Sequence, residues 1–321
     1  MTGKLAPLSP EAYAKEILPL TAALWANGRT FDAYVAQTLE LARTPYGKRH
    51  YQTFGFRVNR KVVASFKRYE RMARLGSQRL TSIGIGAIFT PAEQRGHGYA
   101  SAMLAMALDN ARAERFDFAF LFSDIHPQFY KALGFVELSS RLITFRADSL
   151  SNKRLDVATL SQKDWPGIRR CFDATDARRN WGFERGPAFW GWLQTRIQHG
   201  SEHARGRAVR LVARRGRAIA AYVLGQREPK HDAYVLDEFG FASEKDRALI
   251  GPLLRAAAGD FRRITGWLPP DSVRDLLPRG SVRKRKDALL MIAPLSSRGK
   301  KFLERAKATG AADGVWSTDH I

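Results

Sequence analysis

The chain has little cysteine, no long apolar run and no leader-like start. Cys171 is the single cysteine among 321 residues, which excludes a disulfide framework and a metal site built from thiolates. No segment reaches the roughly 18 consecutive apolar residues that a membrane-spanning helix needs. The first residues lack the charged and then apolar profile of a signal peptide. These absences predict a cytoplasmic protein with no membrane partner.

Acidic residues are also scarce relative to basic ones, at 31 against 53, and the net charge is +22. The excess amounts to +8 over residues 1–150 and +14 over residues 151–321. A field of this sign attracts polyanions such as nucleic acid, acidic lipid or a nucleotide-bearing cofactor. The alternative is a set of solvated arginines, and the spread of the excess along the chain favours it. Nucleic acid is therefore a possible partner, but not the favoured one.

The first half of the chain is predicted to contain helices followed by β-rich sequence. Ser9 and Pro10 mark a helix start, and apolar residues recur at helical spacing over 30–42. The pattern then predicts a hairpin over 54–70, a strand over 80–90, a helix over 101–114, a strand over 116–124 and a short helix over 127–135 that ends at Gly134.

The second half repeats this order about 150 residues later. The pattern predicts a hairpin over 208–225, a strand over 231–241, a helix that Ser243 opens and Ala258 closes, and a strand over 264–270. We therefore expect an α+β protein with two copies of one fold in tandem, each a mixed, mostly antiparallel sheet flanked by helices. The expected boundaries are 1–150 for the first domain, 151–295 for the second and 296–321 for a C-terminal tail.

The stretch FTPAEQRGHGYAS, residues 89–101, joins an expected strand to an expected helix. The N–H groups at a helix N-terminus are unpaired and lie at the positive end of the helix dipole. Gly96 and Gly98 leave room for an anion to approach these groups, and Arg95 adds a full positive charge. The stretch therefore predicts a phosphate-binding loop.

Two better-known glycine loops are excluded. A dinucleotide-binding loop needs a third glycine, where this chain has Ser101, and it follows its strand directly. The Gly-x-x-x-x-Gly-Lys-Ser/Thr pattern of nucleoside-triphosphate loops occurs nowhere in the sequence. The pair Gly84 and Gly86 lies inside the expected strand, which indicates a bulge or the close approach of another segment.

Two motifs together resemble the GNAT superfamily of N-acetyltransferases. Arg95-x-x-Gly98-x-Ala100, after a strand and a proline, is similar to the family's pyrophosphate signature, and Tyr130-x-x-x-Gly134-Phe135 is similar to the motif that closes its core. Both motifs look most like those of the fungal lysine N-acetyltransferases. The duplicated layout and the C-terminal residues are similar to tandem GNAT proteins of the enhanced-intracellular-survival type. The second copy has acidic residues over 240–250, where a phosphate loop should be, so we expect it to be degenerate.

The resemblance implies a GNAT-like fold for both domains and acetyl-CoA as the co-substrate, with no metal. The acetyl group would pass directly to an amine, without a covalent enzyme intermediate. The strand end would pair with the pantetheine, one of its N–H groups would polarise the thioester carbonyl, and the loop amides would bind the pyrophosphate. The implied cofactor-binding residues are Ala87, Ile88, Phe89, Arg95, Gly96, His97, Gly98, Tyr99, Ala100 and Ser101.

Two protons must move in such a reaction. By resemblance, Tyr130 donates a proton to the departing thiolate. The amine must lose one, because a lysine ε-amine is neutral in only about one molecule in 2,500 at pH 7, so a base or a water chain is expected. The candidate bases are Asp124, His126, Glu93, Asp319, His320 and the carboxylate of Ile321, since the tail reaches the active site in some tandem relatives.

We expect an N-acetyltransferase that acts on a primary amine of a small molecule, such as lysine or another amino acid. The alternative is a nucleic-acid-associated or protein-lysine-modifying factor that uses the basic GNAT fold as a platform. The sequence does not fix the acceptor or the oligomeric state.

Overall fold

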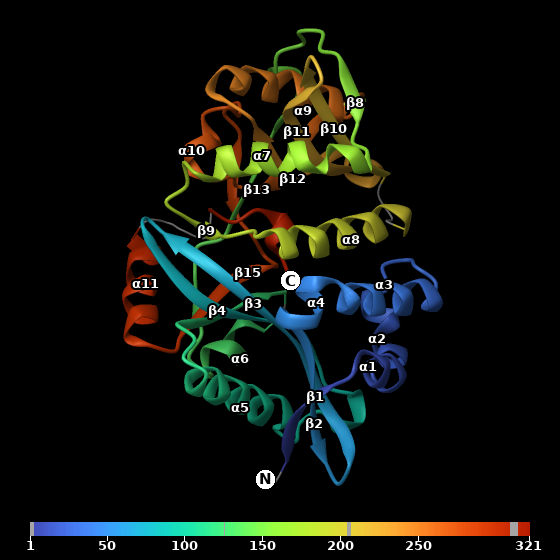
Figure 1. Ribbon diagram of the computed structural model, residues 1–321, viewed down its shortest axis with the longest axis vertical. Coiled ribbons are helices and arrows are strands. Elements are labelled where there is room, and N and C mark those ends of the chain that lie inside the picture. The colour runs from blue at the N-terminus through green and yellow to red at the C-terminus, as the bar shows by residue number, and fades with distance from the viewer. Residues whose placement is uncertain (1–2, 125, 204–206, 309–313) are drawn as a thin grey trace.

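Two mixed β-sheets lie one above the other along the long axis of the molecule, and the C-terminus lies between them (Figure 1). The structure is a computed structural model of residues 1–321, and it describes residues 3–124, 126–203, 207–308 and 314–321. No helix in these described ranges has the length and apolar character needed to cross a membrane. The predicted α+β architecture, with two mixed, mostly antiparallel sheets flanked by helices, is confirmed.

The first sheet is built mainly from the N-terminal half. Its strands run in the order β1 (Lys4–Leu8), β2 (Tyr51–Val58), β3 (Lys61–Leu75), β4 (Gln78–Phe89), β5 (Phe118–Ser123), β15 (Leu289–Pro294) and β6 (Val136–Glu137), and β9 (Trp181–Phe183) pairs with the far end of β3. The β4–β5 pair is parallel, and the other pairs described in this sheet are antiparallel.

The second sheet has the same arrangement of one parallel pair within antiparallel neighbours. Its order is β14 (Ser281–Lys284), β7 (Arg141–Arg146), β13 (Arg263–Trp267), β12 (Ala233–Phe241), β11 (Ala218–Glu228), β10 (Arg207–Arg215) and β8 (Val157–Thr159), with β12 and β13 parallel. The predicted hairpins β2–β3 and β10–β11 are both present.

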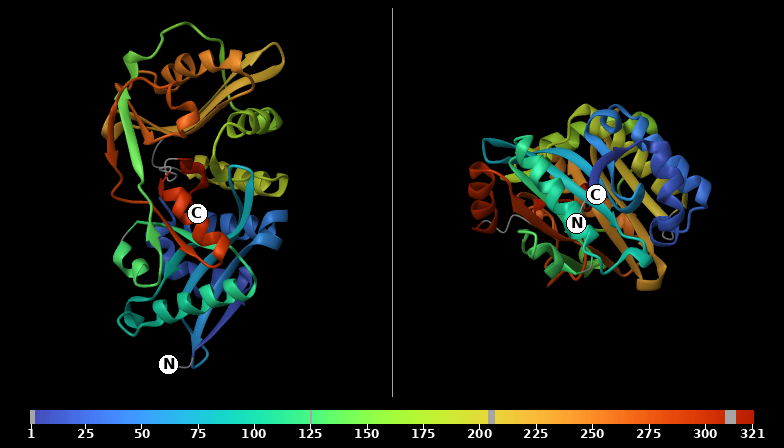
Figure 2. Two further views of the ribbon diagram at one scale, coloured as in Figure 1. Left: turned by 90° about the vertical axis from the view of Figure 1, so that its left-hand side faces the viewer. Right: turned by 90° about the horizontal axis from the view of Figure 1, so that it is seen from below.

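The two halves exchange a strand. β15, from the C-terminal half, pairs with β5 in the first sheet, whereas β7, from the N-terminal half, pairs with β13 in the second. Figure 2 shows the long connections that carry the chain from one sheet to the other. The sheets therefore do not divide the chain at residue 150 or at residue 295, and the expected boundaries stay a prediction about folding units.

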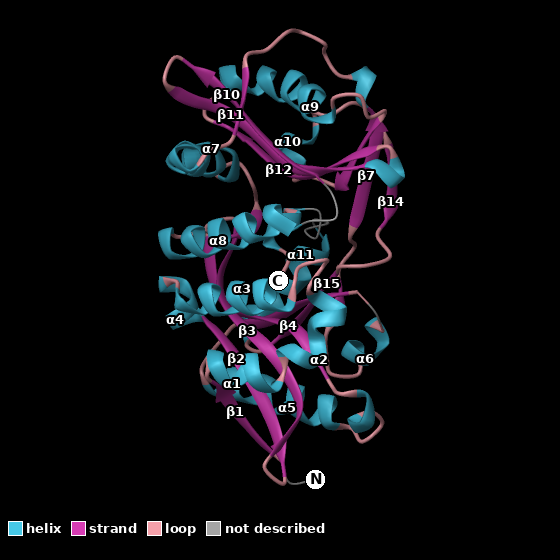
Figure 3. Ribbon diagram, turned by 90° about the vertical axis from the view of Figure 1, so that its right-hand side faces the viewer, coloured by secondary structure: helices cyan, strands magenta, loops and turns pink. Residues whose placement is uncertain are grey.

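Helices cover both faces of each sheet. α5 (Tyr99–Ala113) packs on the outer face of the first sheet, and α3 (Phe31–Arg43), α4 (Pro45–His50) and α8 (Pro187–His203) lie between the two sheets (Figure 1). α7 (Trp165–Asp176) and α9 (Ile250–Ala258) lie on opposite faces of the second sheet (Figure 3). The remaining helices are α1 (Pro10–Glu16), α2 (Leu18–Trp25), α6 (Pro127–Lys131), α10 (Asp271–Arg274) and α11 (Ser297–Ala308).

The first helix breaks at Ile17 into α1 and α2, as the proline at position 19 predicts, because Pro19 enters the first turn of α2. Another helix differs from the sequence expectation. The helix expected to begin at Ser243 starts instead as a 3-10 helix over Glu244–Leu249, and α9 follows it. The Asp246 side chain accepts hydrogen bonds from Ser243 and Arg215. The second half therefore has an acidic turn, bonded to the protein itself, at the position where the first half has its glycine loop. The second copy is degenerate at this point, as expected.

Candidate active site

The glycine loop is open. Gly96 and Gly98 have φ angles of +81° and +74°, a left-handed conformation that glycine adopts without strain. A Cβ built on either residue would meet no atom within 4 Å. The amide of Arg95 donates to the carbonyl of Ala92 at 3.2 Å. In the described parts of the chain no acceptor engages the amides of residues 96–101, so these N–H groups are available to a ligand.

The strand that feeds this loop is bulged. β3 and β4 are in register at Lys67 with Gly86 and again at Ser65 with Phe89, so Ala87 and Ile88 both lie opposite one residue. Ala87 has a φ of +48°, which a non-glycine residue adopts only when its surroundings impose it. The bulge interrupts the β3–β4 pairing between Gly86 and Phe89, so the main chain of Ala87 and Ile88 is out of register with β3.

β4 also parts from β5, and it does so before it reaches the bulge. The parallel pairing covers only Ser82–Gly84 with Phe118–Phe120, and the last residues of β5 pair with β15 on their other side. A slot between the ends of two parallel strands therefore opens toward the glycine loop.

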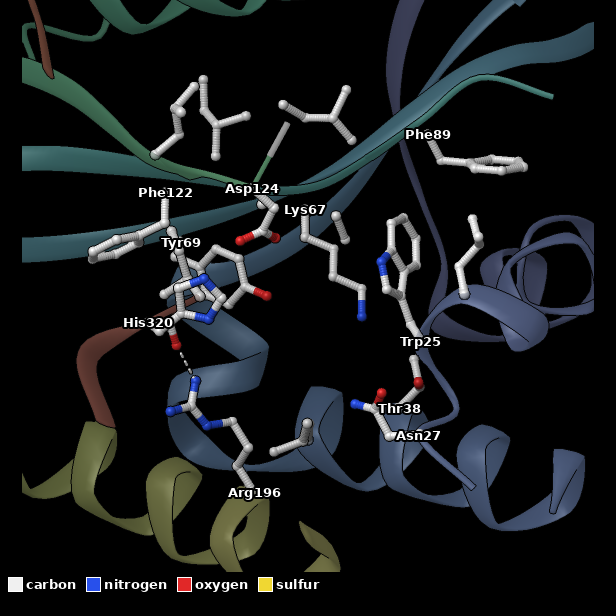
Figure 4. A pocket seen from close by; sticks show the side chains of 18 of the residues that line it. Trp25, Asn27, Thr38, Lys67, Tyr69, Phe89, Phe122, Asp124, Arg196 and His320 are labelled. Atoms are coloured by element: carbon white, nitrogen blue, oxygen red, sulfur yellow. Dashed lines mark hydrogen bonds between the residues drawn. The ribbon is translucent and has the colours of Figure 1, made fainter. Parts of the chain in front are cut away.

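One cavity of about 1040 Å³ joins these features (Figure 4). It is lined by the β4 end, by Arg95 and Ala100 of the loop region, by Tyr130 of α6, by residues of the α2–α3 segment and of α8, and by the C-terminal residues. The second sheet contributes Arg210, Gln226 and Asp237. The cavity therefore connects the loop to the space between the two sheets.

Of the predicted cofactor-binding residues, Ala87, Ile88, Phe89, Arg95 and Ala100 line the cavity. Gly96, His97 and Gly98 are exposed in the loop, and Tyr99 and Ser101 are half-buried in the first turn of α5. The His97 ring stacks on the Tyr99 ring with centroids 5.5 Å apart. The whole predicted set thus lies along one path from the strand end to the helix N-terminus, and its role in binding stays a prediction.

Tyr130 lies beside the slot. Its ring contacts Phe129 and Phe135 edge-on, and its hydroxyl has no hydrogen-bond partner among the residues that the structure describes. Burial raises the pKa of the Tyr130 hydroxyl, and the nearby charge of Asp124 raises it further. The phenol is therefore protonated at neutral pH, which is the state that a proton donor needs.

Asp124 and His126 also line the cavity. Asp124 Oδ1 accepts a hydrogen bond of 3.1 Å from the amide of Ala288 in the exchanged segment, and burial is the main cause that raises the pKa of this carboxyl. His126 precedes α6 with a φ of +53°. Ile125, between them, lies outside the described residues.

The C-terminal residue lies on the pair Gly84 and Gly86. A Cβ on Gly84 would be 2.3 Å from Ile321 Cδ1, and a Cβ on Gly86 would be 3.2 Å from the carbonyl carbon and oxygen of Ile321. The glycines therefore admit the close approach of another segment, as the sequence indicated, and that segment is the tail. The main-chain carboxyl group of Ile321 lies one residue from the β4 bulge.

A buried charge cluster holds the tail in this place. Asp319 Oδ1 lies 3.1 Å from both Arg71 of β3 and Arg185, and Arg185 also pairs with Glu238 of β12 at 2.7 Å. Burial alone would raise the pKa of Asp319, but the charges of Arg185 and Arg71 hold it below its usual value. Both halves of the molecule thus anchor residues 318–321.

The cluster leads to a prediction about stability. Asp319→Asn keeps the shape of the side chain but leaves Arg71 and Arg185 without their shared charge partner in a fully buried site. We expect the free energy of unfolding in urea to fall by about 3 kcal/mol, the low end for breaking a buried pair. The control is Asp109→Asn, whose pair with Arg112 is exposed and whose loss should leave the urea midpoint nearly unchanged. Equal midpoints for the two variants would show that the cluster does not anchor the tail.

The other candidate bases occupy different environments. Glu93 is exposed in the 3-10 helix Ala92–Gln94 and does not line the cavity. The Asp319 carboxylate is paired with Arg71 and Arg185, so it is not available as a base. His320 lines the cavity with its ring packed against Phe122 and Trp267, at centroid distances of 5.0 and 5.9 Å, and burial lowers its pKa to about 4. The structure therefore leaves Asp124, His126 and the carboxyl group of Ile321 beside the slot.

Sequence reasoning missed several residues that line the cavity. Trp25, Asn27 and Thr38 come from the α2–α3 segment, Lys67 and Tyr69 from β3, and Arg196 from α8 (Figure 4). None of them belongs to a motif, and only the pairing of β3 with β4 and the docking of α8 bring them together. The one signal in the sequence was the alternation of β3, which predicts that Lys67 and Tyr69 share a face.

Residues 18–137 match the family model described as an acetyltransferase (GNAT) domain. This part of the chain is therefore identified as a GNAT acetyltransferase domain, and the prediction of an acyltransferase enzyme is confirmed. Comparison with curated protein sequences finds no match.

Solved structures share the fold of the whole chain. A conserved protein of Enterococcus faecalis V583, described as a probable N-acyltransferase, is similar with a TM-score of 0.72 and 16% identity over 95% of this chain and 75% of that one. Eis1 from Mycobacterium abscessus has a TM-score of 0.61 at 14% identity, over 92% and 74%. A tandem GNAT protein from the clavulanic acid biosynthesis pathway has a TM-score of 0.52 at 12% identity, over 92% and 99%. The tandem GNAT-like fold is confirmed, and the finer resemblance to fungal lysine N-acetyltransferases stays a prediction.

Proposed function

We propose that the protein transfers an acetyl group from acetyl-CoA directly to a primary amine of a small molecule. The observation that carries the proposal is the single cavity that joins an open anion-binding loop, a bulged strand end and an unengaged phenol. Gly96 and Gly98 keep the loop amides open to the diphosphate, and the slot between β4 and β5 takes the pantetheine as an added strand. The N–H groups at the bulge would stabilise the oxyanion that forms on the thioester carbonyl, an effect worth about 3 kcal/mol where such donors have been removed.

The reaction balances with the groups at this site. The amine nitrogen attacks the thioester carbonyl carbon and forms the C–N bond, and the C–S bond then breaks. The departing coenzyme A thiolate takes the proton of the Tyr130 hydroxyl. Starting from its ammonium form, the acceptor nitrogen loses two protons, one before the attack and one as the amide forms. One of these protons replaces the one that Tyr130 gave up, and the products are an N-acetyl amide, free coenzyme A and one released proton.

We assign the removal of the amine proton to the carboxyl group of Ile321. It lies on Gly86, next to the bulge where the thioester carbonyl is expected, and the Asp319 cluster fixes it there. Asp124 and His126 lie toward α6, on the side of Tyr130, where they are placed to return the tyrosine's proton. The assignment predicts that a chain with one glycine added after Ile321 keeps its affinity for acetyl-CoA but loses turnover.

The proposal is tested by thiol release from acetyl-CoA in the presence of amino acids, polyamines, aminoglycosides and peptides, with mass detection of the acetylated product. We expect amine-dependent thiol release with at least one small primary amine, well above the rate without amine. Coenzyme A affinity is measured by calorimetry on the same preparation. Tight coenzyme A binding without thiol release for any amine would contradict the transfer reaction. Only the assignment of the coenzyme A site would then stand. Salt-sensitive DNA retention without turnover would favour the nucleic-acid alternative.

A further inference from the structure

One cation in the cavity is not engaged by the protein. Lys67 extends from β3 into the cavity between Asp124 and Trp25 (Figure 4). Within the described ranges its ammonium group has no ion pair and no hydrogen bond, and it lies over the rings of Tyr13 and Tyr51, with centroids 5.3 and 5.8 Å away. Burial raises the pKa of both tyrosines, so neither hydroxyl supplies a negative charge.

The arginines that line the cavity donate to main-chain carbonyl groups, and Arg95 of the loop donates from Nε to the carbonyl of Thr90 at 3.2 Å. Arg29 donates to the carbonyls of Trp25 and Ala26. Arg196 donates to the carbonyls of Thr318 and His320, and Arg210 to that of Ile197. These arginines hold the residues of the cavity wall in place, whereas all three N–H donors of the Lys67 ammonium group are available to a ligand.

The position of Lys67 relates it to the expected reaction centre. In the β3–β4 register it lies directly opposite Gly86, next to the bulge, and residues so paired point to the same face of a sheet with Cβ positions about 5 Å apart. That face carries Tyr69 and the Ile321 carboxyl group. Helix α5, whose N-terminus follows the glycine loop, packs on the other face. Lys67 therefore faces the acceptor side and not the diphosphate side.

We propose that Lys67 binds the carboxylate of the acceptor, and that the acceptor is a free amino acid whose amine and carboxylate are only a few bonds apart. This inference rests on the proposed function and narrows its substrate class. The ammonium group would form charge-assisted hydrogen bonds with the carboxylate. The amide of Asn27 and the hydroxyl of Thr38, which donates to the Tyr34 carbonyl at 3.0 Å, also line the cavity (Figure 4).

The geometry favours a carboxylate over a phosphate ester. A phosphate carries up to two charges and is usually held by several donors or by a guanidinium fork, but Lys67 is a single point charge and the nearby arginines are engaged by carbonyls. A neutral amine would leave the ammonium group without a partner in the complex, which is costly for a desolvated charge.

The test compares amino acids with their primary amides as acceptors. The amide has the same side chain and amine but no negative charge, so a preference for the acid reports on recognition of the carboxylate. The parent should use the amino acid with a kcat/KM at least about 10-fold higher, as expected for a hydrogen bond to a charged group. Lys67→Met should raise the KM for the amino acid by about the same factor and leave the KM for the amide and for acetyl-CoA unchanged. Lys67→Arg should keep the preference, and Lys61→Met, an exposed lysine of the same strand, should behave like the parent.

The outcomes separate this inference from the function on which it rests. Equal use of acids and amides by the parent would overturn the carboxylate site while transfer stands. An acid preference that survives in Lys67→Met would also overturn it. No transfer to either acceptor series would overturn the inference together with the transferase. If Lys67→Met does not fold, the ratio of kcat/KM for the amino acid to kcat/KM for its amide, measured in the parent and in Lys67→Arg, still tests the carboxylate site.

Discussion

Gly98→Val is expected to reduce coenzyme A affinity by at least about 100-fold, below detection in most calorimetric titrations. Two effects act together. The valine side chain would fill space that contains no protein atom within 4 Å, and that space is where the diphosphate must approach the amides. A β-branched residue is also strained at a φ of +74°, so the loop would rotate its N–H groups away. The loss of several charge-assisted hydrogen bonds accounts for the size of the effect.

A matched control separates the site from backbone strain. Gly216 has a φ of +59° at the turn between β10 and β11, and a Cβ there would also meet nothing within 4 Å. Gly216→Val therefore introduces the same kind of strain at a place without a ligand. It should lower stability slightly and keep coenzyme A affinity. Unchanged affinity in Gly98→Val, or equal losses in both variants, would show that the glycine loop does not bind the cofactor.

The second large effect is expected for Tyr130→Phe, which should lower turnover by about 100-fold, the low end of the range for general acid–base catalysis. The substitution removes only a hydroxyl that has no partner within the described protein, so packing against Phe129 and Phe135 is kept. The thiolate would then leave without a proton donor. Coenzyme A affinity should stay near that of the parent, because the ring remains in place.

The measurement is the steady-state rate of thiol release at saturating acetyl-CoA, with affinity from calorimetry. Tyr234→Phe is the control, because it removes a tyrosine hydroxyl bonded to the Val209 carbonyl in the second sheet, away from the slot. A Tyr130→Phe variant with the turnover of the parent would remove Tyr130 from the mechanism.

Local features of the site could be predicted from the sequence because they depend on local chemistry. A loop that exposes main-chain amides at positive φ needs glycine, and Gly96 and Gly98 are close together in the sequence, so the loop can be recognised from a few residues. Gly84 and Gly86 likewise signalled the close approach of a second segment, although not which one. Strands and helices with clear periodicity, such as β5 and α5, followed from patterns of 6 to 15 residues.

The long-range features could not be predicted from the sequence. Nothing in residues 289–294 distinguishes a strand that pairs with β5 from one that stays in the second sheet, because both environments are buried and apolar. The same holds for Lys67, which reads as an ordinary polar position of a β-strand until the tail, α8 and β4 enclose it. Asp319 was a candidate base from the sequence, and only the approach of Arg71 and Arg185 in the fold makes it an anchor of the tail.

The most direct test of the account is the crystal structure of the protein with coenzyme A. We predict that the diphosphate lies within about 3 Å of main-chain nitrogens of residues 96–101, with the pantetheine between β4 and β5 and its sulfur directed toward Tyr130. Coenzyme A bound elsewhere, or a diphosphate held by side chains with these amides turned away, would contradict the central claim that the open glycine loop is the cofactor site.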